Sequence, residues 1–175
     1  MRDRRKRLTP RSAVPTLCPL CRNCDQMYDS IIEAERDGYV ISTEKSRLDV
    51  VAIHAYLTQS YWSPGIPKTV VEKAIAGSLC FGLFTAKGEQ VGFARMVTDS
   101  ATFAYLADVY VLEEHRGKGL SKWMMQTILA HPSLQGLRRI LLATRDAHGL
   151  YAQYGFKPLA RPESMMEIHH PNVYD

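Results

Sequence analysis

The sequence predicts a single α/β domain with a mixed, largely antiparallel central sheet and flanking helices. Most strand-like segments follow one another along the chain, which favours antiparallel hairpins, whereas one strand–helix–strand unit requires a parallel pair. A chain of 175 residues, 46% of them apolar, is long enough for one domain with a core but too short for two comfortable ones. Since no run of about 18 apolar residues occurs, we expect no membrane span and a cytoplasmic protein.

The first half of the chain has one strand signal and two helix signals. Residues 39–43 (YVIST) predict a short strand, and residues 47–62 predict a helix in which apolar positions recur at helical spacing: Leu48, Val51, Ala52, Ala55 and Tyr56. The sequence SPGIP ends this helix. A second, shorter helix is expected over residues 68–78, ended by Gly77 and Ser78.

The second half alternates strand and helix signals around two glycine-containing loops. Residues 78–86 and 89–99 form a hairpin candidate around Lys87 and Gly88, and the alternating, aromatic-rich residues 102–112 predict a long strand. The elements expected after it are a helix over residues 120–131 stopped by Pro132, a strand over 138–144, a short helix over 147–154, and two weaker strands over 156–159 and 164–170.

The positive charge is concentrated at the start of the chain. Residues 1–26 hold seven Arg or Lys against two Asp, whereas residues 27–175 hold fifteen against sixteen acidic residues. We therefore predict a basic, disordered extension over residues 1–26, followed by the functional domain over residues 27–175. Cys18, Cys21 and Cys24 have the spacing of a zinc knuckle, but no fourth ligand lies nearby, so we expect no metal site. The alternative function is a non-catalytic protein whose basic, cysteine-rich extension binds zinc or nucleic acid.

A basic, glycine-containing loop, HRGKGLS, lies between the long strand and the helix that begins near residue 120. Backbone N–H groups in the first turn of a helix have no helical partner, and together with the helix dipole they favour an anion. Gly117 and Gly119 would permit a positive φ and a close approach to a phosphate. The loop lacks both the GxxxxGK[ST] and the GxGxxG patterns, so a phosphate cradle and a plain helix N-cap both remain open.

Two motifs at a fixed separation extend this evidence. VYVLEEHRGKGLS followed by LYAQYGF resembles the two central signatures of the GNAT superfamily of N-acetyltransferases. The acyl-coenzyme A loop of that family is matched by Arg116, Gly119 and Ser121, with Ser where Gly or Ala is usual. The second signature is matched by Tyr151, which is followed by AQY and then Gly155 and Phe156. The resemblance covers about residues 39–169.

The resemblance implies acetyl-CoA as cosubstrate and assigns residues to it. The loop would hold the pyrophosphate through the backbone of Gly117 to Ser121, assisted by the charges of Arg116 and Lys118. The strand before it, splayed from its neighbour, would pair its backbone with the pantetheine arm and polarise the thioester carbonyl. Where many relatives carry an Asn that contacts the cofactor, either Thr144 or Asp146 would be the substitute in this chain. The cofactor contacts expected in full are Val109, Tyr110, Val111, Arg116, Gly117, Lys118, Gly119, Leu120, Ser121 and Asp146.

Transfer of an acetyl group to an amine requires a stabilised leaving thiolate and a proton acceptor for the amine. The resemblance assigns the thiolate side to Tyr151. For the base we favour Asp108, with a proton relayed by solvent as the competing explanation. Strand alternation predicts Asp108 on one face with Leu106 and Tyr110, opposite Val109 and Val111.

The acceptor side is expected in the variable first half of the chain. Tyr61 and Trp62 lie in a loop bounded by Pro and Gly, where aromatic side chains could line a substrate pocket or cover the core. Phe103 and Tyr105 are weaker candidates of the same kind. The acceptor is expected to be a small-molecule amine or a peptide amine, with no membrane or nucleic-acid partner. The sequence does not determine the oligomeric state, and a homodimer remains open.

Overall fold

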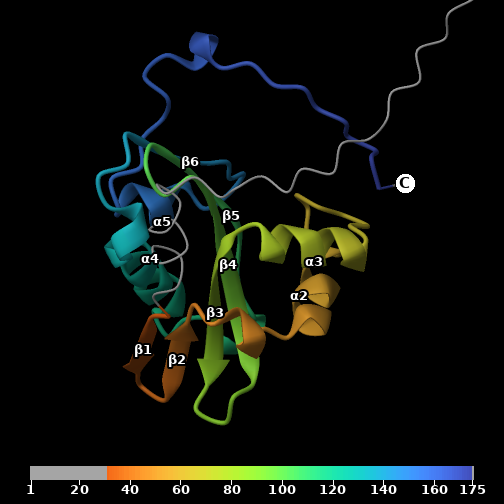
Figure 1. Cartoon of the computed structure of the whole chain (residues 1–175), viewed down its shortest axis with the longest axis vertical. Coiled ribbons are helices and arrows are strands. Elements are labelled where there is room, and N and C mark those ends of the chain that lie inside the picture. Colours follow the sequence, from red (N-terminus) through yellow and green to blue (C-terminus); the bar gives the residue numbers. More distant parts are fainter. Residues whose placement is uncertain (1–30, 175) are drawn as a thin grey trace, which may run out of the picture. The chain divides into compact units, whose positions relative to one another are not determined.

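The central feature of the computed structural model, which describes residues 31–174, is a six-stranded sheet whose strands lie in chain order (Figure 1). Neighbouring strands from β1 to β5 pair antiparallel, and β5 pairs with β6 in parallel. The prediction of one domain with a mixed, largely antiparallel sheet is thereby confirmed for the described residues. The strands are β1 (Glu33–Arg36), β2 (Tyr39–Ser42), β3 (Leu79–Thr85), β4 (Gln90–Thr98), β5 (Phe103–Val111) and β6 (Arg139–Leu142).

Helices cover both faces of this sheet (Figure 1). On one face, α2 (Val50–Leu57) and α3 (Lys68–Ala76) bury their apolar residues against β3, β4 and β5. On the other face, α4 (Leu120–Ala130) and α5 (His148–Ala152) complete a second apolar cluster. Short 3-10 segments are η2 (Lys45–Arg47), η3 (Glu113–His115), η4 (Pro132–Leu134) and η5 (Pro162–Ser164).

The helix α2 forms where it was expected but buries a different face. Its N-terminus is capped by the carboxylate of Asp49, which accepts hydrogen bonds from two first-turn amides. Ile53 and Leu57 are buried, whereas Val51 and Ala55, both on the expected apolar face, are exposed. The segment VVAIHAYL is apolar nearly all round, so its spacing alone could not select the buried face.

The strands β5 and β6 separate part of the way along their length. Their parallel pairing begins with Phe103 opposite Arg139 and ends with Leu106 opposite Leu142. Beyond that point β5 continues to Val111, paired only with β4 on its other side. The splayed strand that the family resemblance implied is therefore present, and its open edge borders a cleft.

A β-bulge at Asp108 lies where this separation begins. Arg95 of β4 faces Ala107 and Phe93 faces Tyr110, so β5 contains one extra residue, and Asp108 has a φ of 55°. The extra residue reverses the alternation. Leu106 shares the α4-side cluster with Val109 and Val111, and the prediction that it would face the other way with Asp108 is wrong. The Tyr110 side chain packs in the α2–α3 cluster, opposite Val109 and Val111 as predicted.

The ends of the described unit differ from the sequence expectation. The strand β1 was not predicted, because its sequence EAER is polar and mostly exposed and so carries no apolar alternation. The weak strands expected over 156–159 and 164–170 are absent from the described structure. Pro158 has no amide hydrogen to give to a ladder, and Met166 and Ile168 are 97% and 89% exposed rather than packed. Within residues 31–174 no helix has the length and apolarity needed to cross a membrane.

Candidate active site

A cavity of about 320 Å³ opens at the N-terminus of α4. Gly117 and Gly119 line it with φ values of 77° and 74°, a conformation that other residues adopt only with strain. A Cβ atom added to Gly119 would meet no atom within 4 Å, so the space above the loop is free. The remaining lining residues are Val111, Arg116, Leu120, Ser121, Lys122 and Leu150.

The first turn of α4 directs unpaired amides at this cavity. Trp123 is the first residue whose amide donates within the helix, to the carbonyl of Gly119 at 3.0 Å. The amides of Leu120, Ser121 and Lys122 therefore have no intrahelical acceptor, and all three residues line the cavity. The dipole of this eleven-residue helix adds a partial positive charge at the same end. Loop and helix together fit a diphosphate.

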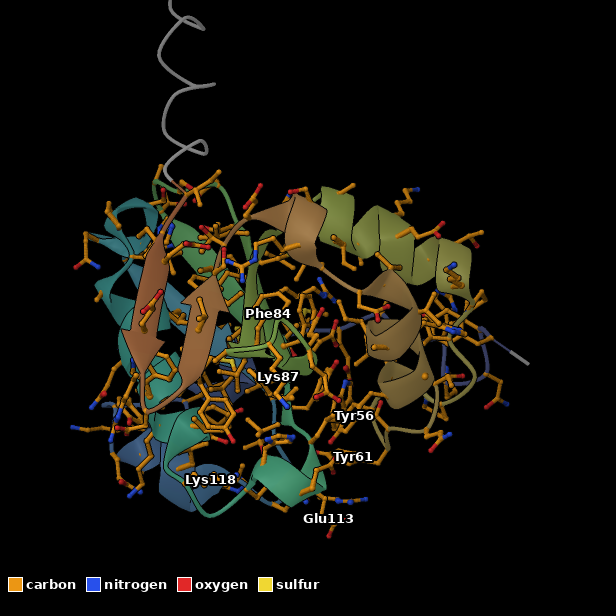
Figure 2. The ribbon with its side chains drawn as sticks, turned by 90° about the horizontal axis from the view of Figure 1, so that it is seen from below. Tyr56, Tyr61, Phe84, Lys87, Glu113 and Lys118 are labelled. Atoms are coloured by element: carbon orange, nitrogen blue, oxygen red, sulfur yellow. The ribbon has the colours of Figure 1, made fainter. Side chains whose placement is uncertain are left out.

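The two basic side chains of the loop take different directions. Arg116 donates from Nε to the carbonyl of Val111 at 3.0 Å and lines the cavity. Lys118 donates to the hydroxyl of Tyr39 at 2.8 Å, beside His115, and does not line the cavity. In Figure 2, Lys118 lies away from Tyr56 and Tyr61, which lie near α2. Of the two charges expected at the cofactor, the structure brings only that of Arg116 to the cavity.

A second, larger cavity of about 1100 Å³ continues from the first. It lies where β5 and β6 diverge and is bounded by residues 105–111 of β5, residues 143–147 after β6, and the loop after α2. Four residues line both cavities: Val111, Arg116, Ser121 and Leu150. The cavity at the N-terminus of α4 and the larger cavity are thus parts of one cleft.

Tyr151 lines the larger cavity from α5 and is only 8% exposed. Its ring packs edge-on against Phe156, with 5.9 Å between ring centroids. Burial raises the pKa of Tyr151 to about 12, with contributions of the same sign from Tyr61 and Asp146, so the hydroxyl keeps its proton at neutral pH. Among the described residues none hydrogen-bonds this hydroxyl, which leaves it free to donate into the cleft.

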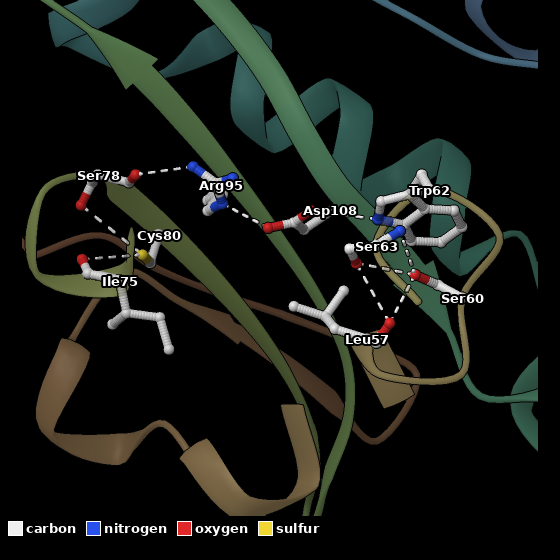
Figure 3. A network of polar contacts seen from close by, with 9 residues as sticks. All are labelled: Leu57, Ser60, Trp62, Ser63, Ile75, Ser78, Cys80, Arg95 and Asp108. Atoms are coloured by element: carbon white, nitrogen blue, oxygen red, sulfur yellow. Dashed lines mark hydrogen bonds and ion pairs between the residues drawn. The ribbon is translucent and has the colours of Figure 1, made fainter. Parts of the chain in front are cut away.

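Asp108 lines the same cavity and is the centre of a polar network (Figure 3). One carboxylate oxygen forms an ion pair with Arg95, and the other accepts from the indole N–H of Trp62 at 3.2 Å. Arg95 also donates to the hydroxyl of Ser78 at 3.3 Å. The sequence pointed to Asp108 but missed Arg95, although a single charge inside the apolar strand QVGFARMVT was a usable signal.

The predicted acceptor residues lie on the wall of the larger cavity. Tyr61 and Trp62 are 44% and 40% exposed and contact each other edge-on, with 4.9 Å between centroids. The Tyr61 hydroxyl accepts from the Arg145 amide at 3.2 Å, and the Arg145 guanidinium lies 3.8 Å from the ring centroid. Tyr105 lines this cavity as well, whereas Phe103 lines neither.

Two further expectations concern the loop before α5. Thr144 accepts a hydrogen bond from the Ala147 amide at 3.0 Å, so its hydroxyl stabilises the turn into the helix. Asp146 lines the larger cavity with an exposed side chain 3.8 Å from Arg145. Both residues therefore border the cleft, and their contact with a cofactor stays a prediction.

The cysteines divide between described and undescribed parts of the chain. Cys18, Cys21 and Cys24, with the basic extension predicted over residues 1–26, lie outside the described residues. Cys80 is buried, and its thiol lies 3.6 Å from the carbonyl oxygens of Ile75 and Ser78 (Figure 3). Burial raises the pKa of this thiol to about 11, which makes it unreactive at neutral pH. Within residues 31–174 no three His, Cys, Asp or Glu side chains cluster in a way that could hold a metal ion.

Comparison with known proteins decides the family. The family model described as an acetyltransferase (GNAT) domain matches residues 77–158. A Gibberella zeae protein named "Putative acetyltransferase" is 36% identical over 140 residues, covering 67% of this chain and 78% of that protein. A crystal structure of a GNAT-family protein from Xanthomonas campestris is 53% identical with a TM-score of 0.77, covering 80% of this chain and 99% of that one. The chain belongs to the GNAT family.

Membership in the GNAT family supports acetyl transfer from acetyl-CoA as the class of reaction. A more distant structure, described as a predicted acetyltransferase with acetyl-CoA from Clostridium acetobutylicum, is 13% identical with a TM-score of 0.56 and shares the fold. It covers 75% of this chain and 94% of its own. In this GNAT protein the cavity at α4 has the free space and unpaired amides that a CoA diphosphate requires.

Proposed function

We propose that the protein is an N-acetyltransferase that moves the acetyl group of acetyl-CoA to a primary amine within a ternary complex. The observation that carries this proposal is the continuity of the two cavities, which share residues at the open edge of β5. A cosubstrate held at α4 and an amine held in the larger cavity would meet at that edge. Direct attack then needs no covalent enzyme intermediate.

The cavity at the N-terminus of α4, which we call the donor end of the cleft, would bind acetyl-CoA chiefly through backbone groups. The backbone from Gly117 to Ser121 and the Arg116 guanidinium would hold the pyrophosphate, because the free amides of Leu120 and Ser121 and the Arg116 side chain belong to residues that line one cavity. The Leu112 amide donates to Val91 of β4, so alternation directs the N–H and C=O of Val111 towards the cleft. Arg116 already donates a hydrogen bond to the Val111 carbonyl. The Val111 N–H would therefore be the group that donates to the thioester carbonyl oxygen, and one such donor in a water-poor cleft is worth about 3 kcal/mol.

Tyr151 would stabilise the leaving sulfur. In the reaction a bond forms between the amine nitrogen and the carbonyl carbon, the carbon–sulfur bond breaks, and the thiolate receives a proton. With a Tyr151 pKa of about 12 and a thiol reference near 8.5, complete proton transfer from Tyr151 would cost about 5 kcal/mol. We therefore assign hydrogen-bond donation to the Tyr151 hydroxyl and final protonation to solvent.

Asp108 would receive the amine proton, directly or through a water molecule. It lines the acceptor cavity at the bulge, and its two oxygens are oriented by Arg95 and Trp62. Such fixed orientation favours proton transfer, because a general base acts only within hydrogen-bond reach of its proton. The proton would leave the larger cavity through its solvent-facing mouth.

The test is a thiol-release assay with acetyl-CoA over a panel of amines, run on wild type and Tyr151→Phe. We expect Tyr151→Phe to lower kcat by about 10- to 100-fold while the KM for acetyl-CoA changes little. Because the pKa of Tyr151 is raised to about 12, the ratio of the wild-type kcat to the Tyr151→Phe kcat should stay constant from pH 7 to pH 10.

The matched control is Tyr154→Phe, whose hydroxyl donates to the Lys122 carbonyl at 2.8 Å and lines neither cavity. It should keep nearly full kcat. Equal rates for wild type and Tyr151→Phe would overturn the role of Tyr151. If no amine causes thiol release and acetyl-CoA does not bind, the proposed function is overturned.

A further inference from the structure

The larger cavity, which we call the acceptor end of the cleft, is lined by aromatic rings that come from separate parts of the chain. The Tyr56 ring stacks on the Tyr110 ring with centroids 3.8 Å apart and planes 11° apart. The ring centroid of Trp62 lies 6.4 Å from that of Tyr56 and 4.9 Å from that of Tyr61. The aromatic residues lining the cavity besides Tyr151 are Tyr56, Tyr61, Trp62, Tyr105, Tyr110 and Tyr174. Such walls favour a flat, apolar occupant.

The charges of this cavity do not suit a polycation. Among the described residues that line it, Asp108 and Asp146 are acidic, and three arginines are basic: Arg95, Arg116 and Arg145. Asp108 is paired with Arg95, and Asp146 lies 3.8 Å from Arg145. An acceptor with several ammonium groups would meet a net positive surface. An acceptor with one amine needs only the single carboxylate of Asp108.

The loop after α2 is held firmly across the cleft. On the β5 side Trp62 donates to Asp108, and on the β6 side Tyr61 accepts from the Arg145 amide. The base of the loop is fixed by buried serines, since Ser60 and Ser63 both donate to the Leu57 carbonyl, at 2.7 and 3.2 Å (Figure 3). The aromatic walls are therefore in place before an acceptor binds, which lowers the entropy cost of binding.

We infer that the acceptor is a primary amine joined through a short alkyl chain to a flat aromatic ring. Resting on the proposed acetyl transfer, this assignment places the ring among the aromatic walls and the amine towards Asp108. Arg145, whose side chain is 67% exposed at the cavity, could also take a carboxylate. The shared chemistry is thus an arylalkylamine with or without a carboxyl group.

The experiment compares kcat/KM for five amines in the thiol-release assay: 2-phenylethylamine, L-phenylalanine, 2-cyclohexylethylamine, spermidine and a short lysine-containing peptide. We expect one of the two aromatic amines to exceed spermidine and the peptide at least tenfold. 2-Phenylethylamine should exceed its non-planar cyclohexyl counterpart at least threefold. The ratio of the two aromatic amines reports whether a carboxylate is recognised.

Two variants connect the preference to the cavity. Trp62→Leu should lower kcat/KM for the preferred aromatic amine about tenfold while leaving the KM for acetyl-CoA unchanged, because Trp62 lines only the larger cavity. The control Phe103→Leu removes an aromatic ring of similar exposure, 37%, that lines neither cavity, and should leave both constants unchanged.

Direct binding separates this inference from the proposed function. The chain has two tryptophans, of which Trp123 is buried and Trp62 is exposed at the cavity, so an aromatic amine should change the Trp62 fluorescence. The inference is overturned if spermidine or the peptide is the better substrate, or if neither aromatic amine binds. If acetyl-CoA neither binds nor reacts, the proposed function fails, and the fluorescence titration alone still decides the class of amine.

Discussion

The two ends of the cleft are built in different ways. The donor end is formed mainly by the backbone of one short stretch, from Arg116 to Lys122, with two glycines in the left-handed region. The acceptor end is formed by side chains from α2, the loop after it, β4, β5, the β6–α5 loop, α5 and Tyr174. A site made of backbone depends on local conformation, whereas a site made of side chains depends on how the whole sheet is assembled.

This difference predicts where substitutions matter. At the donor end a new side chain is harmful when its atoms enter the cavity, while most existing side chains there are dispensable. At the acceptor end each side chain is part of a wall or of the network around Asp108.

Gly119→Val should nearly abolish acetyl-CoA binding. The new side chain would enter the open space above the loop and strain a residue whose φ is 74°. Since each hydrogen bond to a charged group is worth about 1.5–3 kcal/mol, losing one or two weakens binding by about 100-fold. Isothermal titration calorimetry with acetyl-CoA measures the change.

The matched control for this change is Gly136→Val. Gly136 also has a positive φ, 72°, and open space around its Cβ position, but it lies after η4 and lines neither cavity. The two variants should lose similar stability on thermal unfolding, and only Gly119→Val should lose affinity. Unchanged affinity in folded Gly119→Val would show that the donor end does not depend on this backbone.

Arg95→Met should impair the acceptor end alone. Without Arg95 the Asp108 carboxylate keeps only the Trp62 contact, so its position at the bulge is no longer fixed. We expect kcat/KM for the amine to fall about tenfold with the KM for acetyl-CoA unchanged, as for a positioning residue.

A double-mutant cycle with Asp108→Asn gives the stronger test of that role. If Arg95 acts through Asp108, Arg95→Met should have little further effect in the Asp108→Asn background. Fully additive losses would contradict the coupling.

Lys118→Met should have the smallest effect, although its position in the loop motif suggests a phosphate contact. Its ammonium is bound to the Tyr39 hydroxyl outside the cavity. Affinity for acetyl-CoA should therefore change less than about threefold, which is the range of a solvent-exposed charge. Arg116→Met, which removes a charge from the cavity, should weaken binding more, and the reverse order would break the proposed division of roles.

The same contrast explains how much the sequence could predict. The sequence could point to Gly119 and Tyr151 as candidates because their motifs are local, and the structure places both residues at the cavities. Tyr56, Arg95 and Arg145 were missed, since nothing near them in the chain shows that topology brings them to one chamber. Asp108 was named as a candidate, but Leu106 was assigned to the wrong face of β5, because apolar alternation does not reveal the extra residue of the bulge.

The bulge at Asp108 also bears on how this protein avoids unwanted association. A strand that loses its neighbour exposes amide and carbonyl groups on which a foreign strand could grow. Here the open edge of β5 is short, twisted at Asp108 and partly capped, because Arg116 occupies the Val111 carbonyl. The short edge offers few free backbone groups on which an extended polypeptide could form an intermolecular sheet, whereas the proposed pantetheine arm would need only a few.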